Sequence, residues 1–310
     1  MKVLVTPRSF GQTDKYAFQM LEDAGFCVIR NDTGGILSEA QLLGYISDCE
    51  GVILGVDPLT STVIEKSPKL KAVAKYGVGV DNIDLEACKE RGISVSRTVG
   101  ANADAVADYA FALMLAVARN IIPIDASCRK SDWGKTSALD VNGKILGLIG
   151  LGAIGKGVVT RASGFGMRVL AYDVFWDEKY AISAGIERMS VAEICEQADF
   201  ISIHAPLTEQ TRNMIGEEQI KKMKKTAIII NTARGGIIDE AALLAALKKG
   251  QIFGAGIDAF EVEPPTNTEW FTLPNVVLGS HCAASTAGAI EKMGRMAAAN
   301  LIRDLLNEGE

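Results

Sequence analysis

Short runs of apolar residues alternate with longer stretches of helical periodicity along nearly the whole chain. In the first hundred residues the apolar runs lie at positions 3–6, 27–30, 51–54, 72–74 and 93–95. The segments between them, such as 13–24 and 38–49, carry apolar residues at helical spacing. Uninterrupted apolar strands separated by helices are typical of a parallel sheet covered on both faces. This first series predicts a doubly wound α/β domain.

A second series of the same kind begins after a long apolar helix expected at 103–120. Its strands are expected at 145–149, 168–172, 200–203, 226–231, 253–257 and 276–278. Six strands with crossover helices describe a dinucleotide-binding domain. A final helix at 286–307 has no strand after it and could pack back on the first half. We therefore predict two α/β domains with parallel sheets, one of residues 1–98 with 286–310 and one of residues 99–285.

Composition narrows the function classes. A length of 310 residues suits two domains, and 48% hydrophobic with 23% charged residues is ordinary for a globular protein. A net charge of −6 argues against a nucleic-acid-binding surface. Six cysteines without a C-x-x-C pair or ligand spacing indicate reduced thiols and no metal site. The N-terminus lacks the apolar core of a signal peptide, and the most apolar helix is too short to span a membrane. We expect a cytoplasmic protein.

A glycine-rich loop directly follows the apolar run at 145–149. Gly150 would allow the tight turn, Gly152 the approach of backbone amides to a pyrophosphate, and Gly155 close packing of helix on strand. The helix that begins near Gly152 would direct unpaired N–H groups at the phosphates. The candidate cofactor-binding residues of this loop are Gly150, Gly152, Ala153, Ile154 and Gly155.

The next expected strand ends in Asp173, eighteen residues after Gly155. A carboxylate there would accept hydrogen bonds from the adenosine ribose hydroxyls and repel a 2′-phosphate. Residues 174–176 offer no arginine for such a phosphate, so NAD is favoured over NADP. The structural alternative is a glycine-rich turn with an ordinary surface aspartate.

Three later motifs follow the loop in order: Asn-Thr-Ala-Arg-Gly-Gly at 231–236, Gly-Ile-Asp-Ala-Phe-Glu-Val-Glu-Pro-Pro at 256–265, and Ser280-His281. With them the chain resembles the D-2-hydroxyacid dehydrogenase family from about Val3 to Leu306, and most of all its phosphoglycerate dehydrogenase branch. The resemblance implies a flavodoxin-like substrate domain, a Rossmann-like NAD-binding domain, a cleft between them and a C-terminal helix that returns to the first domain. It also implies an NAD(H)-dependent oxidoreductase acting on a small acid. A homodimer through the cofactor domain, using the long helix after Asn102, is implied as well.

The same resemblance assigns three catalytic residues. Arg234 matches the arginine that binds the substrate carboxylate and polarises the reacting carbonyl, a bidentate task that suits a guanidinium. His281 matches the acid–base histidine, and imidazole can hold or release a proton near neutral pH. Glu263 matches the carboxylate that hydrogen-bonds the other ring nitrogen. The structural alternatives are an arginine that caps its own loop and a histidine that is only a satisfied polar residue.

Further site residues follow from the resemblance. Those expected to line the cofactor are Val106, His204, Pro206, Thr232, Ala233 and Asp258, although an aspartate after a strand is often a helix cap. Those expected to meet the substrate are Val78, Gly79 and Asn102. Gly77 and Gly79 would let consecutive amides face a carboxylate, or they could belong to a simple glycine-rich turn.

The chain departs from the phosphoglycerate dehydrogenase pattern in the loop at 55–60. That branch usually places an arginine and a serine there for the substrate phosphate, whereas this loop has no cation and carries Asp57, expected to be unpaired. Arg8 could supply a substitute charge or be an exposed loop residue. We therefore expect an unphosphorylated 2-oxo acid such as glyoxylate, hydroxypyruvate or a sugar-derived keto acid, with D-3-phosphoglycerate dehydrogenase as the alternative. An NAD-sensing, corepressor-like binding protein is the alternative from another class. Cys282 could make the site sensitive to oxidation or be a small packing group.

Overall fold

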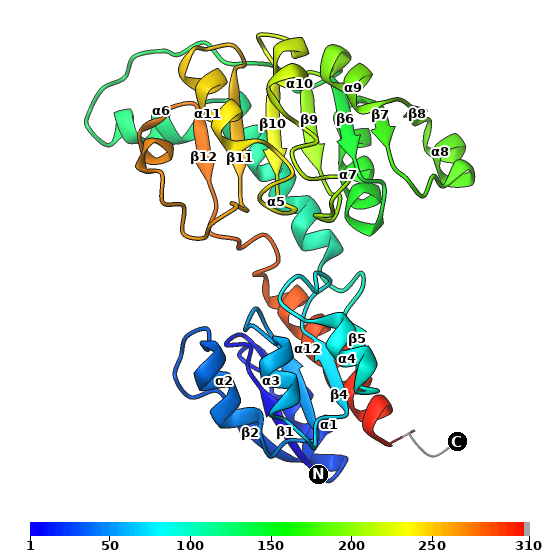
Figure 1. Cartoon of the computed structure of the whole chain (residues 1–310). Helices are drawn as coiled ribbons and strands as arrows, with labels where there is room; N and C mark the ends of the chain where they lie inside the picture. Colours follow the sequence, from blue (N-terminus) through cyan, green and yellow to red (C-terminus); the bar gives the residue numbers. More distant parts are fainter. Residues whose placement is uncertain (307–310) are drawn as a thin grey trace. The chain divides into compact units, whose positions relative to one another are not determined.

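A computed structural model describes residues 1–306 of the chain, which divides into two compact units. The first unit consists of Met1–Asn102 and the C-terminal segment that starts at Ser285, and the second is Ala103–Ala284 (Figure 1). The first boundary between the units, after Asn102, lies four residues after the predicted boundary. The second, after Ala284, lies one residue before the predicted boundary.

The first unit is built on a five-stranded parallel sheet with the order β2-β1-β3-β4-β5. Its strands are β1 (Lys2–Val5), β2 (Cys27–Arg30), β3 (Gly51–Leu54), β4 (Ala72–Lys75) and β5 (Ser94–Arg97). Its helices are α1 (Tyr16–Asp23), α2 (Glu39–Ile46), α3 (Ser61–Glu65), α4 (Leu85–Glu90) and α12 (Ala287–Leu306). The order reverses at β1, so the chain winds to both sides of it.

Both faces of this first sheet are buried, as its apolar strands predict. Val3 and Val5 pack with α1 and α12 on one face, whereas Leu4 and Val52 pack with α2, α3 and α4 on the other. The C-terminal helix α12 lies so close to β3 that a side chain at Gly51 would collide with Leu305. A helix distant in sequence therefore completes the core of the first unit.

The second unit has seven parallel strands in the order β12-β11-β10-β9-β6-β7-β8 (Figure 1). They are β6 (Ile145–Ile149), β7 (Arg168–Tyr172), β8 (Glu187–Arg188), β9 (Phe200–Ile203), β10 (Ile228–Asn231), β11 (Gly254–Ile257) and β12 (Val276–Leu278). The prediction of six strands was wrong by one. The missed strand β8 has two charged residues at the edge of the sheet, so no apolar run marks it.

Helices cover both faces of this second sheet. They are α5 (Ala103–Ala118), α6 (Ile121–Cys128), α7 (Ala153–Gly164), α8 (Glu178–Ala184), α9 (Val191–Gln197), α10 (Glu217–Lys222) and α11 (Glu240–Lys248), with a 3₁₀ helix η1 (Thr268–Thr272). The expected long helix stops at Ala118, because Asn120 is left-handed with φ of 50° and α6 starts anew. The two α/β units confirm the predicted fold class.

Only one pair of helices among residues 1–306 has the length and apolar composition that a membrane span requires. Within residues 1–306 no single helix is long and apolar enough to cross a membrane, although α5 and α6 together pass such a test with a bend of 61° between them. Nine residues of α5 are buried in the core.

Candidate active site

The carboxyl ends of five strands in the second unit meet at one edge of its sheet. Loops after β6, β7, β9, β10 and β11 begin at Gly150, Asp173, His204, Thr232 and Asp258. The order reverses between β6 and its neighbours β7 and β9, the place where open parallel sheets bind ligands. Most of the sequence-predicted cofactor residues therefore gather at this edge.

In the glycine loop, packing within the fold requires glycine at positions 150 and 155 but not at position 152. A side chain at Gly150 would lie 2.6 Å from the carbonyl carbon of His204, and Gly150 has φ of 103°. A side chain at Gly155 would collide with the carbonyl oxygen of Gly150. At Gly152, the N-cap of α7, a Cβ would meet nothing within 4 Å. The open space over the start of α7, beside Ala153 and Ile154, suits an anionic group.

Asp173 is tied to the glycine loop. Its carboxylate accepts hydrogen bonds from the N–H of Leu151 at 2.6 Å and of Phe175 at 2.7 Å. A carboxylate has about four lone-pair sites, so acceptor capacity remains for two sugar hydroxyls. Phe175 is 89% exposed beside it. The arrangement suits a ribose with an apolar surface next to it.

One cation beside the loop after β7 was not predicted from the sequence. Arg188 lies over the ring of Trp176, with its guanidinium carbon 5.2 Å from the ring centroid. It reaches that place because β8 pairs with β7, with Arg188 opposite Ala171. In the sequence Arg188 only follows a helix, and nothing there indicates the strand that brings it to Trp176.

Two buried polar atoms at the same edge have no partner in the described part of the chain: His204 Nδ1 and Thr232 Oγ1. The Nε2 atom of His204 lies 2.8 Å from Ser202 Oγ. Although some of the residue stays accessible, enclosure of the ring lowers the pKa of His204 to about 4, so the ring is neutral at neutral pH. Unpartnered buried polar groups are costly and rare, and they point to a missing ligand. Together with the space at Gly152, they fit a bound dinucleotide.

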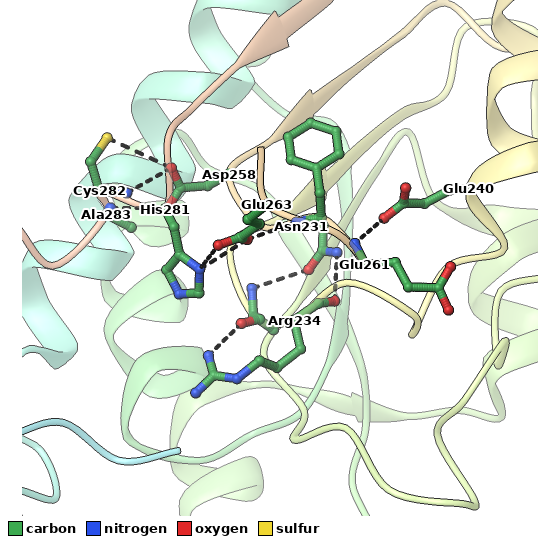
Figure 2. A network of polar contacts seen from close by, with 11 residues as sticks. Asn231, Arg234, Glu240, Asp258, Glu261, Glu263, His281, Cys282 and Ala283 are labelled. Carbon is green, nitrogen blue, oxygen red and sulfur yellow. Dashed lines mark hydrogen bonds and ion pairs between the residues drawn. The ribbon is translucent and has the colours of Figure 1, made fainter. Parts of the chain in front are cut away.

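His281 and Glu263 form a hydrogen-bonded pair at the next two loops (Figure 2). His281 Nδ1 lies 2.9 Å from Glu263 Oε2 and 3.0 Å from Oε1, and the side chains are 42% and 37% exposed. Burial works to raise the pKa of Glu263, but hydrogen bonds from His281 and the Phe260 N–H, and the charges of His281 and Arg234, hold it below its usual value. With Nδ1 turned to an ionised carboxylate, Nε2 is left to face a reacting group.

The backbone of His281 is unusual. Its φ is 56°, and its N–H donates to the carbonyl oxygen of Asp258 at 2.8 Å. The following N–H groups of Cys282 and Ala283 donate to the two carboxylate oxygens of Asp258 at 3.0 and 2.9 Å. Non-glycine residues in this region store strain, which often marks a functional site.

Asp258 is therefore an anchor of the histidine loop and not a helix cap. It is 1% exposed, and both of its carboxylate oxygens accept backbone N–H groups. Cys282 Sγ lies 3.3 Å from the hydroxyl of Tyr109 and 3.6 Å from Asp258 Oδ1. Cys282 is thus part of a polar cluster, whereas we expected either an oxidation-sensitive thiol or an apolar packing group.

Arg234 stands on a loop that Asn231 shapes. Asn231 Oδ1 accepts from the N–H of Ala233 at 3.1 Å, and its Nδ2 donates to the carbonyl oxygen of Arg234 at 2.9 Å. Arg234 Nη1 donates to the carbonyl oxygen of Ala233 at 2.7 Å. In Figure 2 the side chains of Arg234, Glu263 and His281 extend to the same side of their loops. Of the residues predicted to line the cofactor, Pro206 is exposed on the loop after β9, and Val106 is buried in α5.

The first unit holds the predicted substrate loop after β4. Gly77 has φ of 140°, and its N–H donates to Thr98 Oγ1 at 2.9 Å. The N–H groups of Val78 and Gly79 donate no hydrogen bond within residues 1–306. Asn102 Oδ1 is buried without a partner among those residues.

Arg8 is exposed on the loop after β1. Within residues 1–306 it forms no ion pair. Its exposure fits both alternatives, a substitute charge for a phosphate and an exposed loop residue.

The expectation about Asp57 was wrong. Asp57 is 2% exposed and accepts hydrogen bonds from the hydroxyl of Thr6 and, at 2.8 Å, from the N–H of Leu37. A cation also lies at this loop, because buried Lys75 donates to the carbonyl oxygen of Gly55 and to Asn82 Oδ1. Both partners of Asp57 are distant in sequence, so the loop at 55–60 read alone could not reveal them. Repulsion by Asp57 is no argument against a phosphorylated substrate.

Comparison with known proteins identifies what the chain resembles. The sequence model described as "D-isomer specific 2-hydroxyacid dehydrogenase, NAD binding domain" matches residues 111–283. A glyoxylate reductase of Korarchaeum cryptofilum is 42% identical over 273 residues, which are 86% of this chain and 82% of that protein. A D-3-phosphoglycerate dehydrogenase of Methanocaldococcus jannaschii is 42% identical over 312 residues, covering 99% of this chain and 58% of the longer relative. The crystal structure of D-lactate dehydrogenase from Aquifex aeolicus, complexed with NAD and lactic acid, superposes with a TM-score of 0.86 at 30% identity over 99% of this chain and 96% of that one.

Proposed function

The chain belongs to the D-isomer specific 2-hydroxyacid dehydrogenase family, and we propose that it reduces a small unphosphorylated 2-oxo acid, such as glyoxylate or hydroxypyruvate, with NADH. As a member it is an NAD-dependent oxidoreductase that interconverts 2-oxo and D-2-hydroxy acids. The observation that carries the residue assignment is the His281–Glu263 pair with Arg234 beside it. The glyoxylate reductase relative supports the choice of a small substrate.

In the proposed mechanism His281 is the proton carrier. Its Nε2 donates a proton to the carbonyl oxygen as the carbonyl carbon is reduced, and takes it back in the reverse direction. Glu263 holds Nδ1 and thereby fixes the tautomer and the ring orientation. Arg234 binds the carboxylate with its planar fork and stabilises negative charge on the reacting oxygen. The dinucleotide, when bound, supplies the hydride, so hydride and proton together convert C=O to CH–OH.

The cofactor would be held by the loops of the second unit. We assign the pyrophosphate to the start of α7, the ribose hydroxyls to Asp173, and the nicotinamide end to the surroundings of His204 and Thr232. The residues of this proposed site are Val106, Gly150, Gly152, Ala153, Ile154, Gly155, Asp173, His204, Pro206, Thr232, Ala233 and Asp258. The orphaned His204 Nδ1 and Thr232 Oγ1 support this assignment.

The proposed substrate contacts of the first unit are the amides of Val78 and Gly79, with Asn102. Successive unpaired N–H groups form a small anion site that suits a carboxylate. Arg8, exposed on the loop after β1, is the remaining proposed substrate contact of this unit.

A substrate screen tests the proposed function. Loss of the NADH absorbance would be followed with glyoxylate, hydroxypyruvate, pyruvate and 3-phosphohydroxypyruvate, each also with NADPH. We expect the highest kcat/KM with NADH and an unphosphorylated acid, and a product of D configuration where the product is chiral. A clear preference for 3-phosphohydroxypyruvate would establish the alternative, D-3-phosphoglycerate dehydrogenase. NADH binding without turnover of any 2-oxo acid would favour a sensing protein.

We further propose a cytoplasmic homodimer that associates through the second unit. All six cysteines are free, which suits a reducing compartment. Helix α6 has no buried residue, and Ile121, Ile122 and Trp133 are 52%, 55% and 79% exposed. Clustered exposed apolar residues often mark a protein interface. Light scattering should give about twice the chain mass, and half that mass for an Ile121→Glu/Ile122→Glu variant; a monomeric wild type would contradict the proposal.

A further inference from the structure

Most side chains of the turn that carries Glu263 are exposed. It begins at Phe260, which is 6% exposed and packs edge-on against Trp270 with ring centroids 5.7 Å apart. Beyond that anchor the side chains of Glu261 and Glu263 are 58% and 37% exposed, and Val262 is 55% exposed. Hydrophobic packing alone therefore fixes only the start of this turn.

One side chain from outside the turn holds its backbone. Glu240 Oε1 accepts a hydrogen bond from the N–H of Glu261 at 2.6 Å. Figure 2 shows Glu240 reaching the main chain at Glu261 while the carboxylate of Glu263 faces His281. Because Glu240 is the first residue of α11, whose N-cap Asp239 accepts from the N–H of Ala242, the tether starts from a fixed helix end.

A second contact joins the same turn to the arginine loop. A side chain at Gly235 would collide with the carbonyl group of Phe260 and the nitrogen of Glu261, so the two backbones touch. Gly235 directly follows Arg234, and buried Ile237 and Ile238 lead from it toward α11. The turn of Glu263 is thus held at two points: by the backbone contact with Gly235 of the Arg234 loop, and by the hydrogen bond from the N–H of Glu261 to Glu240 of α11.

The surroundings of Glu240 disfavour a negative charge on its carboxylate. Burial raises the pKa of Glu240, the N–H of Glu261 lowers it, and the carboxylates of Glu261 and Glu263 raise it further. An uncharged acceptor of the same shape would make the hydrogen bond without that repulsion. The role of the side chain is therefore that of an acceptor, which glutamine can also be.

We propose that Glu240 is a positioning residue that fixes the Glu263 turn against the Arg234 loop and so keeps the Glu263 carboxylate on His281 Nδ1. This inference rests on the proposed function, since it assigns Glu240 a part in the same reaction. Glu240 touches neither the proton nor the substrate and acts through Glu263. Loss of the tether would let the exposed turn move and free His281 to change tautomer.

The test compares Glu240→Ala, Glu240→Ser and Glu240→Gln. Alanine removes the acceptor, serine is too short to reach Glu261, and glutamine keeps the acceptor without the charge. Glu217→Ala is the matched control, because Glu217 is likewise the first residue of a helix, α10, and is 72% exposed. Circular dichroism and melting temperature check the fold of each variant, and the serine variant replaces the alanine variant if the latter does not fold.

The direct readout is the tautomer of His281 from imidazole ¹⁵N shifts, with Glu263→Ala as the reference for a lost partner. The chain has two histidines, so few signals need assignment. We expect wild type, Glu240→Gln and Glu217→Ala to keep the proton on Nδ1, and Glu240→Ala and Glu240→Ser to show mixed tautomers. A displacement of about 1 Å can cost on the order of 100-fold in rate, so kcat of the alanine and serine variants should fall by about 10- to 100-fold. Affinity for NADH should change by less than about twofold, which corresponds to a negligible free energy.

Two outcomes would overturn this proposal. One is a Glu240→Ala protein with the wild-type tautomer and wild-type kcat. The other is a Glu240→Gln protein as impaired as Glu240→Ala, which would assign the effect to charge. If wild type reduced no 2-oxo acid, the proposed function would fail, but the tautomer measurement would still decide whether Glu240 holds Glu263 in place.

Discussion

One set of buried polar groups at the carboxyl ends of each parallel sheet can be compared, and the two sets differ in how their hydrogen bonds are made. At the edge of the first unit, Asp57, Thr6 and Lys75 are buried, and their polar atoms bond to one another's loops. At the edge of the second unit, His204 Nδ1 and Thr232 Oγ1 are buried without a partner among residues 1–306. The first set stabilises its own unit, whereas the second set leaves hydrogen-bonding capacity for the proposed cofactor.

This difference shows that a place at the carboxyl end of a strand does not by itself indicate function. From its place in the sequence, Asp57 could be a carboxylate that faces a ligand. In the structure its two carboxylate oxygens accept hydrogen bonds from Thr6 and Leu37. Asp173 also accepts two backbone N–H groups, but it is only half-buried and borders the open glycine loop. Exposure and free hydrogen-bonding capacity therefore distinguish Asp173 from Asp57, although both are aspartates at the end of a strand.

Apart from the substitution of His281 discussed last, the largest effect is expected from Arg234→Ala. Removal of a group that stabilises developing negative charge typically costs about 10²- to 10³-fold in kcat. Because Arg234 is assigned to the substrate carboxylate as well, KM for the oxo acid should rise, while the Kd of NADH stays constant. Arg168→Ala is the control, since Arg168 is exposed at the start of β7, at the opposite end of that strand from Asp173, and pairs with Glu187. An effect of Arg234→Ala on NADH binding alone would contradict the assignment.

The glycine loop gives the next largest effect. Gly152→Ala meets no protein atom within 4 Å, so the melting temperature should stay near that of wild type. A methyl group there should push the pyrophosphate off the backbone amides, and loss of one or two charge-assisted hydrogen bonds weakens NADH binding by about 10- to 100-fold. Gly155→Ala should instead lower the melting temperature, because its methyl group collides with Gly150. Unchanged NADH affinity in Gly152→Ala, measured by fluorescence titration, would remove the loop from the cofactor site.

A pair of substitutions contrasts the two edges directly. Asp57→Asn leaves an amide group facing donors in the first unit and should lower the free energy of unfolding by about 1–3 kcal/mol. NADH affinity should not change. Thr232→Val removes an unpartnered buried hydroxyl, so stability should be equal or higher and NADH affinity lower. Urea unfolding and NADH titration of both variants measure this, and a destabilised Thr232→Val protein would show that its hydroxyl serves the fold.

A pH dependence of stability is the last expected effect. Burial lowers the folded-state pKa of His204 to about 4, below its usual 6.5. As pH falls below 6.5 the unfolded chain takes up a proton that the folded unit does not, so stability falls until about pH 4 and then levels off. His204→Gln should lack this component of the decline. Equal slopes for wild type and variant between pH 6.5 and 4 would show that the histidine titrates normally.

Much of the fold follows from the sequence, because apolar runs mark buried parallel strands. The expected strands at 27–30, 51–54, 145–149, 168–172, 200–203 and 276–278 have the observed bounds. The charged edge strand β8 and the break at Asn120 lacked such a signal. In the candidate site, the motifs gave Arg234, Glu263 and His281, but the partners of Asp57 and the tether at Glu240 depend on contacts between distant segments. The catalytic residues and the hydrogen bond between Glu263 and His281 could be predicted from the motifs, whereas the contacts of Asp57 and Glu240 could not.

The central claim is that His281, oriented by Glu263, carries the proton in the reduction of a 2-oxo acid. Its most direct test is the turnover of His281→Asn with NADH and the best acid of the screen. The account predicts a kcat lower by about 10²- to 10⁴-fold with an NADH Kd close to that of wild type. A variant that kept near-normal turnover would contradict it.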